Sequence, residues 1–104
     1  MSQVYNTKTL VSEIEKLRNC VIVITDVDCK PCETLMRNLE YLPFIDGIPI
    51  IYAYKKKVSE FYEANNILSV PSTLFYKNGG VTFTMNKSCT RSTFERMIRS
   101  HIYG

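Results

Sequence analysis

The chain has 104 residues, of which 45% are hydrophobic and 22% are charged, with a net charge of +3. This length and balance predict one globular domain over residues 1–104, and the small net charge gives no indication of nucleic-acid binding. The segment before Cys20 lacks the apolar region of a secretory signal, and the longest apolar run, Cys20 to Ile24, is far too short to span a bilayer. We therefore expect a cytoplasmic protein that does not act at a membrane.

Helical and strand-like patterns alternate along the first half of the chain. Apolar spacing predicts a helix over residues 7–19, and the β-branched run Cys20–Thr25 predicts a strand buried on both faces. A second helix should follow this strand, with Pro43 ending or bending it. The side chains expected on the buried faces of these two helices are Leu10, Val11, Ile14 and Leu17, then Leu35, Met36 and Leu39.

The second half of the chain adds a further strand, two helices and a hairpin. The predicted elements are, in order, a strand over Ile48–Tyr54, a helix over 56–66, a strand over Thr73–Tyr76, a turn over Lys77–Gly80, a strand over Val81–Met85 and a helix from Thr90. Residues Gln3 to Tyr5 are a weaker candidate for a first strand. The early alternation predicts a parallel strand pair and the hairpin an antiparallel pair, so we expect an α/β fold with a mixed sheet of four to five strands between helices on both faces.

The four cysteines do not form the pattern of a disulfide framework. Cys29 and Cys32 are close together, whereas Cys20 and Cys89 are distant single residues. A chain of this length can bury a core without disulfide cross-links. Cys20 begins a buried strand and is expected to be a small core residue, and Cys89 is expected to be half-buried or on the surface. The close pair alone leaves three possibilities open, namely metal binding, a structural disulfide and electron exchange.

The segment Asp-Cys-Lys-Pro-Cys (28–32) stands where the predicted strand ends and the next helix begins. Unpaired N–H groups at a helix N-terminus stabilise a thiolate, so we expect a lowered pKa at Cys29. Pro31 suits the first helical turn. Cys32 lies one turn further on, within reach of a mixed disulfide at Cys29. Cys29 is thus the expected nucleophile and Cys32 the resolving thiol.

The charged neighbours of the pair act in opposite directions. Lys30 should lower the pKa of Cys29, and Asp28 should raise it. Both side chains are expected to be exposed, so solvent and salt should weaken both effects. The helix terminus is therefore expected to stabilise a Cys29 thiolate more dependably than either neighbour does.

The motifs together resemble the thioredoxin family. A buried strand, Cys-x-Pro-Cys and a helix are followed about forty residues later by Val70-Pro71-Ser72, an apolar strand and Lys77-Asn78-Gly79. The resemblance extends from Asn6 to Tyr103. It implies the thioredoxin fold, and it implies that Val70–Pro71 is a cis peptide facing Cys29, with the Val70 backbone free to pair with an extended substrate. The glutaredoxin family is less similar, because a Gly-Gly-x-Asp contact after Val81 and a threonine before Pro71 are missing.

Four positions depart from the thioredoxin pattern. Lys30 replaces a glycine between the cysteines, and Asp28 replaces the tryptophan before them. Val23 stands where thioredoxins have a buried aspartate that helps to move the proton of the resolving thiol, and Lys87 replaces a glycine beside the substrate groove. The resemblance therefore implies the thioredoxin chemistry with an altered contact surface.

By this resemblance we expect a monomeric thiol–disulfide oxidoreductase that reduces protein disulfides and takes part in electron transport and cell redox homeostasis. It needs no cofactor beyond the Cys29–Cys32 disulfide, and a flavin-dependent thioredoxin reductase would regenerate the dithiol. The alternative is a binding or regulatory module of the same fold, with the cysteine pair as a redox-sensitive disulfide. Metal binding by Cys29 and Cys32 is a third possibility, although two further ligands would be needed.

Overall fold

The computed structural model describes residues 4–104. Its elements are, in order, α1 (Thr7–Leu17), β1 (Cys20–Thr25), α2 (Lys30–Leu39), β2 (Phe44–Ile45), β3 (Ile48–Tyr54), the 3-10 turn η1 (Lys55–Lys57), α3 (Ser59–Ala64), β4 (Ser72–Lys77), β5 (Gly80–Met85), α4 (Arg91–Ile98) and the π-helical turn η2 (Arg99–Tyr103). The predicted order of helices and strands is confirmed. The short strand β2 is an addition that the sequence pattern did not indicate.

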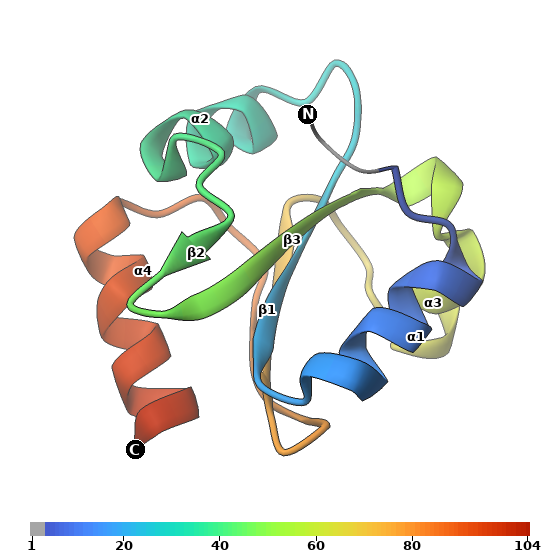
Figure 1. Cartoon of the computed structure of the whole chain (residues 1–104). Helices are drawn as coiled ribbons and strands as arrows, with labels where there is room; N and C mark the ends of the chain where they lie inside the picture. Colours follow the sequence, from blue (N-terminus) through green and yellow to red (C-terminus); the bar gives the residue numbers. More distant parts are fainter. Residues whose placement is uncertain (1–3) are drawn as a thin grey trace.

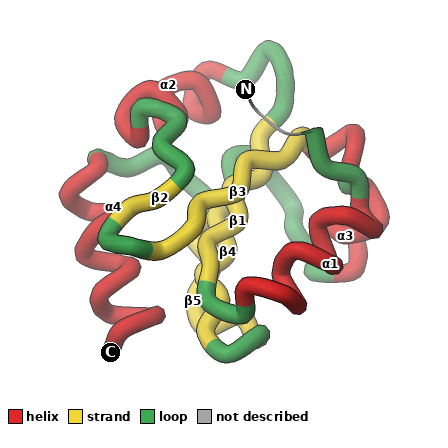
Figure 2. Tube along the Cα trace, viewed as in Figure 1, coloured by secondary structure: helices red, strands yellow, loops and turns green. Residues whose placement is uncertain are grey.

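A mixed sheet forms the centre of the molecule. Within residues 4–104 it has five strands in the order β2-β3-β1-β4-β5, with β1 parallel to β3 and the other neighbours antiparallel (Figure 2). The predicted parallel pair and the predicted hairpin are both present. Strand β1 therefore lies in the middle of the sheet, and the segment that follows it leaves the sheet at its centre.

Helices cover both faces of the sheet, as expected. In Figure 1, α1 and α3 lie on one side of the strands, and α2 and α4 lie on the other. Ile22 and Ile24 of β1 pack with the α1–α3 side, whereas Val21 and Val23 pack with the α2–α4 side. Both faces of β1 are buried, and this explains why its sequence is a continuous apolar run.

Two helices end earlier than the apolar pattern predicts. Helix α1 ends at Leu17 because Arg18 adopts a positive φ of 66°, and Val11, expected on the buried face, is 38% exposed. Helix α2 ends at Leu39 because Glu40 takes the left-handed conformation at φ 55°. The prediction that Pro43 ends or bends this helix is wrong, since the helix stops before the proline is reached.

The predicted helix over residues 56–66 is divided in two. A 3-10 turn covers Lys55–Lys57, and α3 begins only at Ser59. Between them Val58 is fully buried with a non-helical φ of −126°. The candidate strand over Gln3–Tyr5 is not found, because Val4 and Tyr5 belong to no strand and Gln3 lies outside the described residues.

The β4–β5 hairpin has the predicted two-residue turn. Asn78 and Gly79 have φ values of 55° and 84°, the left-handed conformations that such a turn requires. The turn is anchored to the segment between α1 and β1. The Gly79 N–H donates to the Arg18 carbonyl oxygen at 2.8 Å, and the Asn78 N–H donates to Oδ1 of Asn19 at 2.8 Å. None of the described helices is long and apolar enough to cross a membrane.

Candidate active site

Cys29 and Cys32 form a disulfide at the start of α2. Their Cα atoms are 5.2 Å apart. Cys29 is the N-cap residue of the helix, in extended conformation at φ −123°, and Cys32 lies in the first turn. Cys29 is half-buried and Cys32 is fully buried. The outer cysteine is therefore the one that a partner molecule can reach.

The helix N-terminus provides a hydrogen bond to the outer sulfur. The Cys32 N–H donates to Sγ of Cys29 at 3.3 Å. The first N–H groups of a helix have no partner within the helix and carry a partial positive charge, so they stabilise an anion at this place. Pro31 lies in the first turn, where its missing N–H removes no helical hydrogen bond. A thiolate formed at Cys29 after reduction would lie at this stabilised position.

The Val70–Pro71 segment faces the same sulfur. This peptide bond is cis, as the resemblance implies. The carbonyl oxygen of Val70 lies 3.9 Å from Sγ of Cys29, although the two residues are 41 positions apart. Pro71 is buried and Val70 is half-buried. The loop before β4 and the N-terminus of α2 thus meet at Cys29.

The side chains of Asp28 and Lys30 lie in solvent on either side of Cys29. Both are exposed, as expected. Asp28 has a positive φ of 52°, a conformation that aspartate tolerates better than most residues. Solvent weakens the effect of charges at such positions, and the two opposite charges act against each other.

Three solved structures with the same architecture are thioredoxins. Thioredoxin f2 of Chlamydomonas reinhardtii superposes with a TM-score of 0.82 at 16% identity, covering 97% of this chain and 96% of that one. Plasmodium falciparum thioredoxin gives 0.81 at 22% identity, covering 95% and 98%. The Schistosoma mansoni thioredoxin pre-protein gives 0.77 at 22% identity, covering 98% and 100%. The chain has the thioredoxin fold.

The sequence comparisons give no match. No protein-family model matches the chain, and no curated protein matches it at a significant level. At 16 to 22% identity, the similarity to the three structures establishes the fold, and the fold predicted from the sequence is confirmed. What the chain does must therefore be inferred from its own site.

Two departures from the thioredoxin pattern have distinct structural settings. Val23 is fully buried on the sheet face below α2, and its neighbours in register are Tyr52 and Thr73. Lys87 is exposed after β5. The nearby acid Asp26 is half-buried, and its Oδ1 accepts a hydrogen bond from the Val27 N–H at 2.8 Å.

Some residues of the site were not predicted. Ser72, directly after Pro71, is fully buried and contacts Oδ1 of Asn86 through its hydroxyl at 2.9 Å. Leu68 is 92% exposed and Val27 is 59% exposed, so apolar side chains stand in solvent on both loops that meet at Cys29. Hydrophobicity alone would have placed these two residues in the core, and no motif indicated Asn86.

Burial raises the pKa values of the other two cysteines. Cys20 is fully buried in the core, and burial, followed by the nearby charge of Glu13, raises its pKa from 9.0 to about 12. Burial also raises the pKa of half-buried Cys89, although Lys87 acts in the opposite direction. Both expectations for these cysteines are confirmed. Among residues 4–104, no three His, Cys, Asp or Glu side chains are grouped so as to hold a metal ion.

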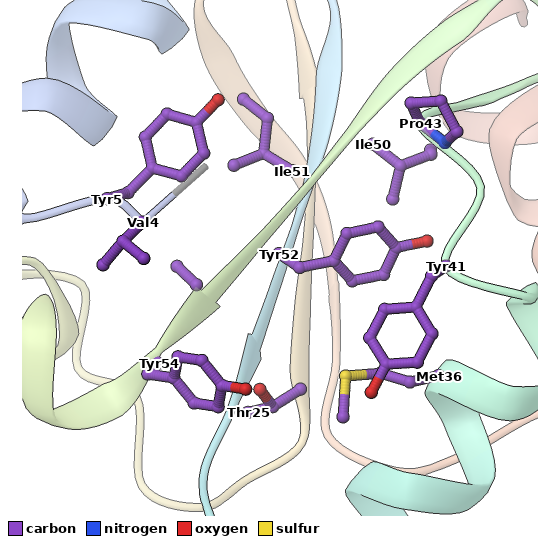
Figure 3. A pocket seen from close by; sticks show the side chains of 11 residues that line it. Val4, Tyr5, Thr25, Met36, Tyr41, Pro43, Ile50, Ile51, Tyr52 and Tyr54 are labelled. Carbon is purple, nitrogen blue, oxygen red and sulfur yellow. The ribbon is translucent and has the colours of Figure 1, made fainter. Parts of the chain in front are cut away.

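A hollow of about 570 Å³ lies along β3 and not at the cysteine pair. Figure 3 shows its side chains on both sides of this strand, with Tyr5 and Ile51 on one side and Tyr41 and Tyr52 on the other. The rings of Tyr41 and Tyr52 lie 5.6 Å apart, and the Tyr52 hydroxyl donates to the Leu42 carbonyl oxygen at 2.9 Å. Neither cysteine of the pair lines this hollow.

Proposed function

We propose that this chain is a thiol–disulfide oxidoreductase that reduces disulfides in other proteins. The observation that carries this proposal is the Cys29–Cys32 pair at the N-terminus of α2, with the Val70 carbonyl oxygen 3.9 Å from Sγ of Cys29. The pair combines an accessible sulfur, a helix terminus that stabilises its anion, and a buried second sulfur within bonding distance. The assignment of Cys29 as nucleophile and Cys32 as resolving thiol is part of the proposal.

The proposed reaction is two successive thiol–disulfide exchanges. In the reduced chain the Cys29 thiolate attacks one sulfur of the substrate disulfide, and the other substrate sulfur leaves as a thiolate and takes a proton from water. Cys32 then loses its proton to water and attacks Sγ of Cys29. The second substrate thiol is released, and the Cys29–Cys32 disulfide carries the oxidation. Two electrons pass to the substrate in all. The Cys32 proton is assigned to water because the buried residue at position 23 is a valine, which cannot accept a proton as an acid side chain could.

The surroundings of the pair favour a protein as the substrate. Val27 and Leu68 offer exposed apolar contacts, and the half-buried Val70 offers its backbone beside the reacting sulfur. A free stretch of backbone of this kind can pair with an extended segment of a protein substrate. A flavin-dependent reductase is the proposed source of the two electrons that restore the dithiol, and a reducing compartment such as the cytoplasm is the proposed setting.

The test is reduction of insulin by dithiothreitol with and without the protein. We expect the wild-type chain to accelerate it, Cys29→Ser to remove the acceleration, and Cys32→Ser to accumulate a mixed disulfide with the substrate that mass spectrometry detects. Cys89→Ser is the matched control and should behave as the wild type, because Cys89 lies outside the pair. An inactive wild type, or full activity in Cys29→Ser, would contradict the proposal and favour a binding module.

A further inference from the structure

A buried serine hydroxyl links two chain segments next to the cysteine pair. Ser72 is fully buried at the start of β4. Its Oγ lies 2.7 Å from the Ser69 carbonyl oxygen and 2.9 Å from Oδ1 of Asn86. A hydroxyl has one proton, so the two acceptors share it. Asn86 belongs to the segment that follows β5, far from Ser69 and Ser72 in the sequence.

These two contacts enclose the segment that faces Cys29. Ser69 and Ser72 flank Val70 and Pro71, so the hydrogen bond from the Ser72 hydroxyl to the Ser69 carbonyl oxygen spans the cis peptide. Asn86 then fixes this closed segment to the end of β5. The Val70 carbonyl oxygen 3.9 Å from Sγ of Cys29 is carried by the segment that is held in this way.

Apolar packing and a polar contact together hold this segment. Ile67 and Pro71 are buried and Val70 packs against the α1–α3 side of the core, whereas Leu68 and Ser69 are exposed and the residues between α3 and β4 belong to no helix or strand. The Ser72 hydroxyl adds a polar link from this loop to the end of β5. Asn86 is itself exposed, so its side chain contributes little to the core. The hydrogen bond that it accepts from the Ser72 hydroxyl is the contact that connects it to the loop.

We propose that Asn86 is a positioning residue that acts through Ser72 to hold the Val70–Pro71 segment against Cys29. This inference rests on the proposed function, in which a protein substrate lies along the Val70 backbone while Cys29 attacks its disulfide. A small disulfide can reach Cys29 without using that backbone. Loss of the Asn86 contact therefore slows exchange with protein disulfides and leaves exchange with small disulfides nearly unchanged.

The test compares second-order rate constants of the prereduced protein with insulin and with hydroxyethyl disulfide. Asn86→Ala should lower the insulin rate constant about fivefold, the effect of one neutral hydrogen bond, and change the other by less than about twofold. Asn86→Asp keeps the acceptor oxygen and should restore the insulin rate. In a Ser72→Ala background, Asn86→Ala should have no additional effect, because the two residues act as one unit.

Asn19→Ala is the matched control. It removes the side-chain oxygen that accepts a hydrogen bond from the Asn78 N–H. Asn19 precedes the start of β1, whereas the cysteine pair follows the end of that strand. Its insulin rate constant should equal that of the wild type. An equal loss with both disulfides in Asn86→Ala, or no loss with insulin, would overturn the inference while leaving the proposed function intact.

Hydrogen exchange of the oxidised protein tests the contact without any turnover. Asn86→Ala should speed amide exchange in the segment over residues 66–73, and Asn19→Ala should not. Unchanged exchange in that segment would overturn the inference. A wild type that reduces neither disulfide would instead contradict the proposed function. Faster amide exchange in Asn86→Ala would in that case mean that the contact stabilises the loop and has no part in disulfide exchange.

Discussion

Thr73 illustrates how a single buried atom affects the stability of this sheet. It lies opposite Val23 in the β1–β4 register, and both side chains are fully buried. Opposite residues of an antiparallel pair share one face of the sheet, which here is the face below α2 and α4. Within the described part of the chain, Oγ1 of Thr73 has no hydrogen-bond partner. A buried hydroxyl without a partner costs free energy because water solvates it in the unfolded chain.

Replacing this hydroxyl with a methyl group should therefore stabilise the fold. Thr73→Val keeps the shape of the side chain, and we expect it to raise the free energy of unfolding by about 1 kcal/mol. Urea denaturation of the oxidised protein measures the change. Thr82→Val is the contrasting control, because the Thr82 hydroxyl donates to the His101 carbonyl oxygen at 2.8 Å and its loss should lower stability. A less stable Thr73→Val would show that the hydroxyl has a stabilising partner.

At the scale of whole elements, polar caps and backbone conformation set the ends of the helices. Helix α1 begins with a reciprocal capping box, in which the Thr9 N–H donates to Oδ1 of Asn6 at 2.8 Å and the Asn6 N–H donates to Oγ1 of Thr9 at 2.9 Å. The helix packs Leu10 and Ile14 into the α1–α3 side of the core. Its position thus depends on two apolar anchors and one polar cap.

Removal of this cap should weaken α1 measurably. Asn6→Ala leaves an N–H group at the helix start without its acceptor, and we expect the free energy of unfolding to fall by about 1 kcal/mol. Asn6→Asp keeps an acceptor at the same place and should lose much less. The two variants can be compared by urea denaturation followed by circular dichroism. Equal stability of Asn6→Ala and the wild type would mean that packing alone holds the first turn.

At the scale of the whole molecule, the fold buries cysteine and tyrosine side chains that are stable there only in their protonated, uncharged form. Burial raises the pKa of Cys20 from 9.0 to about 12 and that of Tyr76 from 10.0 to about 12, and these two residues are opposite each other in the β1–β4 register. Burial likewise raises the pKa of Tyr52. In the unfolded chain these groups have their usual pKa values, so they lose their protons at a lower pH than in the folded chain. Alkaline solution therefore favours unfolding.

The protein should consequently lose stability as the pH rises from about 9 towards 12. A raised folded-state pKa contributes stability that is complete below the unfolded-state pKa and declines above it. Each such group steepens the decline by up to about 1.4 kcal/mol per pH unit. Tyr76→Phe removes one titrating hydroxyl, so its unfolding free energy should fall less between about pH 9 and pH 11 than that of the wild type. Tyr54→Phe, at an exposed ring, serves as the control, and identical slopes in all three proteins would contradict the prediction.

Local sequence patterns were sufficient for much of the fold. The apolar run of β1, the Asn78-Gly79 turn and the helix after Cys29 follow from short-range preferences of backbone and side chain. The positions where prediction failed depend on backbone conformations of single residues. Arg18, Glu40 and Val58 each interrupt or end a helix within a range that the sequence pattern predicts to be helical. Strand β2 is too short to carry a pattern of its own.

In the candidate site, too, some features follow from local sequence patterns and others from contacts between distant segments. The cysteine pair, its place at a helix start and the downstream Val70-Pro71 were predictable, because these are local motifs at characteristic distances. The full burial of Cys32 and the contact of Ser72 with Asn86 were not predicted, whereas the approach of Val70 to Cys29 was implied by the family resemblance. Such contacts join segments far apart in the chain, and they form only when sheet order and register bring those segments together.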